Sequence, residues 1–450
     1  MKQFDTCVGI DLARRAKHKA VVIQKEHTGR TVPNRAWAFS HDLEGFERLR
    51  DRVLKQTGAA SLEGVVVNLE PTSGVWESLS AFLRSQGADV YFTRPDVVSQ
   101  LRKVHSKFAK TDRIDAHTLA SVPSSFPARL IPVVSVERRV RVLRNLSAQR
   151  HRLVGDLTRW KNRFTARAEV VWTGLLAQLE DQQRFCALGR AFLTTFSDPR
   201  KVVRYGRGRF LAWCRKKAHG NTGPELAEKL WEGARTAALL WDELERSGAM
   251  AVDWETLAEL LAQDLRLIEH LEKEIARVDK RIQDARKDVP ECGVLEQLPG
   301  VGKVIAVTLA SILMPVDRFA NTNKCGAYTG FTSRHKASAG REIAGLKMTK
   351  TGNRRLKRDL ALAADVAMQI DPDLARFAIR LLEAGKHYNK VRVAVGRKIA
   401  VRAYSLLKRF QAGQTNVRYL WRDLHGNTIP RHQAMSIARE LWVLHKADHK

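Results

Sequence analysis

The first 125 residues combine short apolar runs with segments that have helical spacing, and this order limits the folds available to the chain. The strand candidates are residues 5–11, 18–25, 31–40, 64–70 and 89–93. The helix candidates are residues 44–55, residues 74–86 and a basic segment that follows the last strand. Three strands followed by alternating helices and strands predict a mixed α/β sheet with helices around it.

Four acidic residues stand at particular places in this pattern. Asp11 ends the first strand candidate and Glu70 ends the fourth, so both would emerge at one sheet edge if those strands are neighbours. Asp112 and Asp115 lie three residues apart and share one face of a predicted helix. Four carboxylates from three segments suit a site where Mg²⁺ or Mn²⁺ holds a phosphodiester. The alternative is structural, with Thr111 or Asp112 capping the helix and Asp115 favoured by the helix dipole.

The charge of the chain indicates what it binds. Lys and Arg number 78 against 48 Asp and Glu, a net charge of +30 that favours a polyanion, either nucleic acid or an anionic membrane. No apolar run reaches the roughly 18 residues of a membrane-spanning helix, and the N-terminus lacks the apolar core of a signal peptide. We therefore expect a nucleic-acid-binding protein of the cytoplasm. Five scattered cysteines predict reduced thiols, with neither a disulfide framework nor a zinc site.

The middle of the chain is predicted to be a basic helical and coiled-coil region. Residues 137–180 interleave apolar positions at helical spacing with many arginines, which is typical of a nucleic-acid-binding helix or of a solvated charged face. Residues 254–287 mix apolar spacings of three and four over about four heptads. We expect this helix to pair with the 137–180 helix or with a second protomer. Residues 186–250 predict a basic, all-helical subdomain whose aromatic residues form a core rather than stack on bases.

A glycine-containing turn opens the C-terminal region. Residues 298–304 (LPGVGKV) follow a helical segment and precede an apolar run, which predicts a helix-hairpin-helix. Gly300 and Gly302 would let the backbone approach a phosphate beside Lys303. The alternative is an ordinary turn between two helices.

A basic loop that carries hydroxyl groups follows at residues 330–341. Ser338 could attack a phosphodiester there, because Arg334, Lys336 and Arg341 could stabilise the negative charge of the transition state. The alternative is that this serine contacts a phosphate or shapes a turn.

Several of these segments resemble DEDD transposases of insertion sequences. The acidic motifs of that family match residues 8–11 (VGID), 69–76 (LEPTSGVW) and 110–116 (KTDRIDA). Residues 298–356, with the segments LPGVG, GF, SAG and KTGNRRL, resemble the C-terminal domain of the same family, in which a serine in the loop is the nucleophile. Matching the loops assigns this role to Ser338. Ala339 stands where glycine is usual and Ser333 stands where proline is usual, so Ser333 is the alternative nucleophile.

The resemblance implies an α/β RNase H-like (RuvC-like) N-terminal domain and a mainly α C-terminal domain. It implies that Asp11, Glu70, Asp112 and Asp115 are a catalytic tetrad that binds Mg²⁺ or Mn²⁺. The implied partners are double-stranded donor and target DNA, a structured non-coding guide RNA (bridge RNA), and further copies of the chain in a dimer or tetramer. Nucleic-acid contacts are expected at Lys110, Gly300, Gly302, Lys303, Arg334, Lys336, Arg341, Lys350, Arg354 and Arg355.

The expected domains are residues 1–125, 126–290 and 291–410, followed by a weakly structured tail at residues 411–450. Three functions compete at this stage. The first is a transposase or recombinase that cuts and rejoins DNA with a serine nucleophile and an acidic tetrad. The second is a metal-dependent endonuclease of the Holliday-junction type, in which the tetrad acts without serine chemistry. The third is a non-catalytic nucleic-acid-binding protein, which a cluster of carboxylates facing phosphates does not favour.

Overall fold

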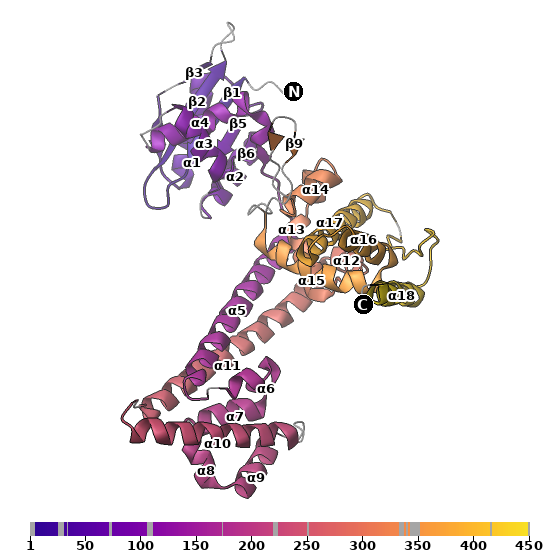
Figure 1. Cartoon of the computed structure of the whole chain (residues 1–450). Coiled ribbons are helices and arrows are strands. Elements are labelled where there is room, and N and C mark those ends of the chain that lie inside the picture. Colours follow the sequence, from indigo (N-terminus) through magenta and orange to yellow (C-terminus); the bar gives the residue numbers. More distant parts are fainter. Residues whose placement is uncertain are drawn as a thin grey trace. The chain divides into compact units, whose positions relative to one another are not determined.

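The chain forms two compact units, Met1–Ser135 and Val136–Lys450, and each is described by itself (Figure 1). The computed structural model describes residues 5–25, 31–33, 35–71, 74–105, 111–172, 174–218, 224–249, 252–332, 337–338, 341–342, 352–414 and 416–448. None of the helices among these residues has the length and apolar character needed to span a bilayer.

The first unit is built on one mixed sheet with the order β3-β2-β1-β5-β6-β7. Its strands are β1 (Thr6–Asp11), β2 (His18–Lys25), β3 (Thr31–Pro33), β4 (Trp37–Phe39), β5 (Val66–Leu69), β6 (Asp89–Phe92) and β7 (Ile131–Pro132). β1, β5 and β6 run parallel, while β2 pairs antiparallel with β1 and β3. The segment predicted as one strand over 31–40 forms two strands, because β3 and β4 pair separately with β2. β7 pairs with β6, so the unit extends past the predicted boundary at residue 125.

Helices cover both faces of this sheet, as the mixed α/β prediction requires. They are α1 (Leu43–Thr57), α2 (Trp76–Ser85), α3 (Pro95–His105) and α4 (Asp112–Ser125). Because side chains alternate along a strand, Val8 and Ile10 point into a core shared with α1 and α2. Gly9 faces the other side, where α4 packs so closely that an added Cβ would lie 2.1 Å from the Ala120 nitrogen. Strand order and directions are consistent with an RNase H-like fold.

Two long helices organise the second unit. They are α5 (Arg138–Glu169) and α11 (Trp254–Ala285), which lie side by side (Figure 1). The predicted helix over 254–287 is thus present, and within this chain it packs on α5. Near one end of the pair, Val140 and Ile282 belong to one hydrophobic core. Near the other, Phe164 and Ile268 belong to a second core.

Ion pairs fix the antiparallel alignment of α5 and α11. Arg150 Nε lies 2.5 Å from Asp279, Lys161 Nζ lies 3.3 Å from Glu272, and Arg167 lies 3.2 Å from Asp264. As the residue number rises along α5, the number of its partner falls along α11. These cations therefore hold the chain's own carboxylates, and the basic character of α5 is in part structural.

A helical bundle surrounds the second core. Its members are α6 (Asp181–Phe185), α7 (Ala187–Thr195), α8 (Pro199–Tyr205), α9 (Arg207–Lys217) and α10 (Pro224–Arg246). Phe192, Phe210, Trp231 and Trp241 are buried in it, which confirms that aromatic residues here form a core.

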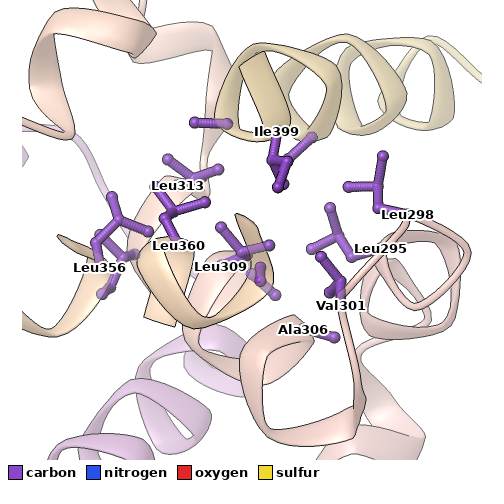
Figure 2. Close-up of a cluster of buried hydrophobic side chains, with 14 of the residues drawn as sticks. Leu295, Leu298, Val301, Ala306, Leu309, Leu313, Leu356, Leu360 and Ile399 are labelled. Carbon is purple, nitrogen blue, oxygen red and sulfur yellow. The ribbon is translucent and has the colours of Figure 1, made fainter. Parts of the chain in front are cut away.

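The C-terminal part of the second unit is mainly helical and surrounds the first core. Its elements are α12 (Glu291–Leu295), α13 (Lys303–Leu313), α14 (Thr322–Tyr328), β8 (Ala337–Ser338), β9 (Arg341–Glu342), α15 (Arg354–Ile370), α16 (Pro372–Glu383), α17 (Tyr388–Gln411) and α18 (Arg431–Asp448). Figure 2 shows side chains of α12, α13, α15 and α17, including Leu295, Leu309, Leu360 and Ile399, converging in this core.

The last segment departs from its prediction. Residues 411–450 were expected to form a weakly structured tail, but residues 431–448 form α18. The Trp442 indole nitrogen donates to the Met368 carbonyl at 2.6 Å, and Ala434 and Ala438 are fully buried. The prediction of weak structure is therefore wrong for α18. The helix was missed because its apolar face is narrow, so the helical period is weak in the sequence. All five cysteines are free thiols, as predicted.

Candidate active site

Two of the predicted acids, Asp11 and Glu70, lie at one edge of the sheet. β1 and β5 are parallel neighbours with Ile10 opposite Leu69. Asp11 is the last residue of β1 and Glu70 directly follows β5, so both stand where these two strands end. Side-chain alternation directs Asp11 to the same face as Gly9, which is the face that α4 covers. The structure thus brings the first two predicted acids together.

The other two acids lie in the first turn of α4. The Thr111 hydroxyl accepts a hydrogen bond from the Ile114 N–H at 3.3 Å, so Thr111 is the N-cap and Asp112 begins the helix. Asp112 is exposed, whereas Asp115 is buried. The Asn68 amide, two residues before Glu70, donates to the Leu119 carbonyl at 2.8 Å, one helical turn after Asp115. The capping interpretation is therefore correct for Thr111, so neither Asp112 nor Asp115 is the N-cap of this helix.

An arginine on a neighbouring helix holds Asp115. Arg102 Nη1 of α3 lies 3.1 Å from Asp115 Oδ1, and the two side chains are only 20% and 12% exposed. Within the residues that the structure describes, no group of three or more His, Cys, Asp or Glu side chains is arranged to hold a metal ion. The donor set is all carboxylate, which suits a hard divalent cation. In the arrangement seen, however, Asp115 is engaged with a cation of the protein.

A histidine pair that sequence reasoning missed supports the turn after Asp11. His18 Nδ1 accepts the Ala13 N–H at 3.1 Å, and His18 Nε2 lies 2.8 Å from His41 Nδ1. His41 Nε2 in turn lies 3.0 Å from the Ser78 hydroxyl. Burial, with a smaller contribution from His41, lowers the pKa of His18 to about 4. Neither Arg102 nor this pair carried a sequence signal, since each depends on contacts between separate elements.

The serine-bearing loop of the second unit is closed at its base by two glycines. Gly330 and Gly352 both have positive φ angles, of 74° and 95°, and a Cβ on Gly352 would lie 2.7 Å from the Gly330 Cα. Phe331 is buried beside this contact, and Arg397 donates to its carbonyl at 3.4 Å. Within the loop, β8 and β9 pair antiparallel with Ser338 opposite Arg341.

Other predicted contact residues cannot be placed. Outside the described residues lie Lys110, Ser333, Arg334, Lys336, Lys350 and the side chains of Ser338 and Arg341.

Half-buried arginines lie near the base of this loop. Arg355, near the start of α15, has a buried Nη1 without a hydrogen-bond partner among the described residues. Burial lowers the pKa of the Arg355 guanidinium, and the charge of Arg152 adds to the effect. Burial and the nearby charges of Arg318 and Arg355 also lower the pKa of Arg144. An anionic ligand would stabilise half-buried cations that repel one another, because it would add opposite charge beside them.

The predicted hairpin is a tight turn between α12 and α13. Gly300 has a φ of 74°, and a Cβ there would lie 2.1 Å from the Ala363 carbonyl of α15, so packing alone requires glycine. Gly302 is the N-cap of α13 and makes no side-chain cap, which leaves the first N–H groups of the helix for another acceptor. Gly302 and Lys303 are exposed at this end, where a phosphate could reach them.

Comparison with known proteins identifies the family. Residues 8–170 match the family DEDD_Tnp_IS110, described as a transposase, and residues 292–378 match the "Transposase IS116/IS110/IS902 family". Together the two matches cover more than half of the chain. The chain belongs to the IS110 family of transposases. A relative is the "Insertion element IS110 uncharacterized 43.6 kDa protein" of Streptomyces coelicolor, 22% identical over 361 residues that cover 78% of this chain and 83% of that protein.

Family membership settles the broad class of activity. An IS110-family transposase is an enzyme that cuts and rejoins DNA in transposition, so the hypothesis of a non-catalytic binding protein is wrong. The first match contains Asp11, Glu70, Asp112 and Asp115, in a DEDD domain of a kind that uses divalent metal. The second contains the turn at Gly300 and the loop with Ser338. Residues 379–450, including α17 and α18, lie outside both matches.

Proposed function

We propose that this IS110-family transposase cuts and rejoins insertion-sequence DNA through a serine nucleophile, Ser338, assisted by an acidic tetrad and directed by a structured bridge RNA. The proposal rests most on one observation. The loop that carries Ser338 begins and ends at the Gly330–Gly352 contact, three residues before Arg355, whose buried Nη1 has no hydrogen-bond partner among the described residues. A phosphate at this place would accept a hydrogen bond from this guanidinium group and oppose its charge.

In the proposed reaction, the Ser338 hydroxyl oxygen attacks the phosphorus of a DNA phosphodiester. An Oγ–P bond forms, the bond from phosphorus to one DNA oxygen breaks, and the proton lost by the serine balances the proton gained by the released DNA hydroxyl. Attack by a hydroxyl of a second strand reverses these bond changes and restores the serine. Rejoining therefore needs no external energy source. Ser333 is the alternative nucleophile in the same loop.

Asp11, Glu70, Asp112 and Asp115 would hold Mg²⁺ or Mn²⁺. Their support is the shared edge of β1 and β5 and the packing of α4 on the same face of the sheet. When bound, the metal would neutralise charge on phosphate oxygens. Arg102 keeps Asp115 paired, and the tetrad would form when Asp115 exchanges this partner for the ion.

Guidance by RNA and assembly with further copies complete the proposal. A net charge of +30 suits simultaneous binding of DNA and RNA, and base pairing would then choose the donor and target sequences while the protein reads backbone and shape. The α12–α13 turn would act as a helix-hairpin-helix that binds a phosphate at Gly302 and Lys303. The α5–α11 pair would act as the coiled-coil element of a dimer or tetramer. The enzyme would act on nucleoid DNA in the bacterial cytoplasm.

A strand-exchange assay with Mg²⁺, bridge RNA, and donor and target duplexes tests this function. Wild type, Ser338→Ala, Ser333→Ala and Asp11→Asn are compared, and covalent protein–DNA species are trapped on a denaturing gel. An adduct that needs both the RNA and Ser338 supports serine recombination. Undiminished cutting in both serine variants, with loss in Asp11→Asn, supports the metal-only endonuclease instead.

A further inference from the structure

The segment after α17 folds back over the helices of the C-terminal region. Val417 is buried in the first core, and Gln297 anchors the segment by accepting the Tyr419 N–H at 3.0 Å and donating to the Val417 carbonyl at 3.4 Å. Beyond this point the chain forms a small hairpin, in which the Ile429 N–H donates to the Trp421 carbonyl at 2.9 Å. Residues 416–430 are called the strap below. Backbone and side-chain bonds hold the strap in one place.

A cavity of about 480 Å³ lies between the strap and helices α16 and α17. This volume is within the usual range for small-ligand sites. Five arginines and three aspartates line it, together with apolar side chains that include Val401, Leu406 and Leu420. Most of this lining follows residue 378, where the second family match ends.

Each aspartate of the cavity is already bonded to the protein. The Tyr419 hydroxyl donates to Asp371 at 2.5 Å, and Arg402 pairs with both Asp371 and Asp373. The Asp423 carboxylate accepts backbone N–H bonds across the turn of the hairpin, from Asn427 at 2.8 Å among others. The acidic side of the cavity is thus an internal network that fixes the strap to α16.

Three arginines of the cavity have no such compensation. Among the described residues, Arg409, Arg418 and Arg422 form no ion pair, and Arg409 donates only to the backbone carbonyl of Arg418, at 3.4 Å. Beside them, Leu420 is 50% exposed, and Trp421 packs edge-on against Tyr419 at 5.3 Å between ring centroids. A concave wall thus carries unpaired guanidinium groups next to apolar and aromatic surface.

We propose that this cavity binds an unpaired nucleotide of a single-stranded nucleic acid, with the neighbouring phosphates on Arg409, Arg418 and Arg422. Guanidinium groups pair with phosphates, and an apolar wall receives a base that is not stacked in a duplex. A base within a duplex stays stacked between its neighbours and cannot enter. This inference rests on the proposed function only in taking nucleic acid as the anionic partner of the enzyme.

Fluorescence anisotropy of the full-length protein tests the site with short labelled single-stranded RNA, single-stranded DNA and duplex DNA of one sequence. The double variant Arg418→Ala/Arg422→Ala is compared with Arg281→Ala/Arg439→Ala, which removes the same charge from two exposed arginines of α11 and α18. We expect the first variant to lose about tenfold or more in single-strand affinity and roughly 1 to 1.5 units of the salt slope. Duplex affinity should change less than about twofold.

Equal losses in the two double variants, or equal losses for single strands and duplex, would overturn the inference. Arg418→Lys/Arg422→Lys should retain more single-strand affinity than the alanine variant, since the charge remains. The RNA and DNA arms identify which strand occupies the cavity. Absence of a covalent adduct in wild type, with selective single-strand binding retained, contradicts the proposed function alone. Adduct formation with unchanged binding in the Arg418/Arg422 variant contradicts this inference alone.

Discussion

Arg102 Nη1 lies 3.1 Å from Asp115 Oδ1, in a pair that is largely shielded from water. The pair joins α3 to the first turn of α4 beside the sheet edge where β1 and β5 end. An acidic residue of the proposed metal site is thus neutralised by the protein itself. Metal binding at this site would have to compete with Arg102 for the same carboxylate.

The substitution Arg102→Gln should separate the two roles of Asp115. Without the competing guanidinium, we expect the Mg²⁺ concentration for half-maximal strand cutting to fall several-fold. In metal-free buffer the protein should lose about 1–3 kcal/mol of stability, because a shielded carboxylate loses its partner. Arg48→Gln, which removes an exposed ion pair with Glu44, should change both quantities little. A Mg²⁺ requirement that rises or stays the same in Arg102→Gln would show that the tetrad does not use Asp115.

Removal of the half-buried Arg355 guanidinium near the serine loop should affect activity more than stability. Arg355→Ala deletes a buried Nη1 that has no hydrogen-bond partner among the described residues, so the melting temperature should stay equal or rise. Strand cutting should fall by about tenfold to a hundredfold if Arg355 contacts the phosphate. Arg358→Ala, an exposed position on the same helix, is the control. Comparable cutting by the two variants would remove Arg355 from the proposed site.

The closure of the serine loop should depend on Gly352. Gly352→Ala places a Cβ 2.7 Å from the Gly330 Cα at a φ of 95°, which forces the base of the loop apart. Gly385→Ala has a φ of 71° with nothing within 4 Å, so it carries only backbone strain of about 1 kcal/mol. We expect strand cutting to drop more than about tenfold in Gly352→Ala and to stay near wild type in Gly385→Ala. Equal activity of the two variants would mean that the contact does not position the loop.

Acid should weaken the first unit through His18. Its folded-state pKa is about 4, below the ordinary value of 6.5, so the unfolded chain binds the proton first as the pH falls. The contribution of neutral His18 to the free energy of unfolding is complete above pH 6.5. It declines by about 2–3 kcal/mol as the pH falls toward 4. Hydrogen exchange of peptides from β1 and β2, expressed relative to the intrinsic exchange rate at each pH, should become faster over this interval in wild type. In His18→Asn the exchange should already be faster at neutral pH and should depend less on pH. Parallel pH profiles for the two proteins would contradict this account.

Local patterns in the sequence predicted most of the elements and one part of the site. The apolar runs at 5–11 and 18–25 correspond to β1 and β2, and the periodic segment 254–287 corresponds to α11. Asp11 and Glu70 could be placed at one edge on the condition that the strands they end are neighbours, and β1 and β5 are parallel neighbours. Strand β7 was missed, since its two residues are too few to show a period.

Contacts between distant elements explain what the sequence could not predict. Arg102 and Asp115 lie on different helices. His18 begins β2, whereas His41 lies between β4 and α1, so no sequence spacing predicts either pair. The arginines of α5 were open to two interpretations until their carboxylate partners on α11 were located. Likewise, one anchor of the strap is Gln297, which lies more than a hundred residues away in the sequence.

The central claim is that Ser338 becomes covalently attached to DNA during strand exchange. The most direct measurement is mass spectrometry of the protein after a denaturing quench of the reaction with Mg²⁺, bridge RNA, and donor and target duplexes. The account predicts a DNA adduct on the peptide that contains Ser338, absent from Ser338→Ala and from reactions without RNA. An adduct confined to Ser333 would move the nucleophile within the loop. Efficient strand exchange with no protein–DNA adduct in wild type, and undiminished in Ser338→Ala, would contradict the claim.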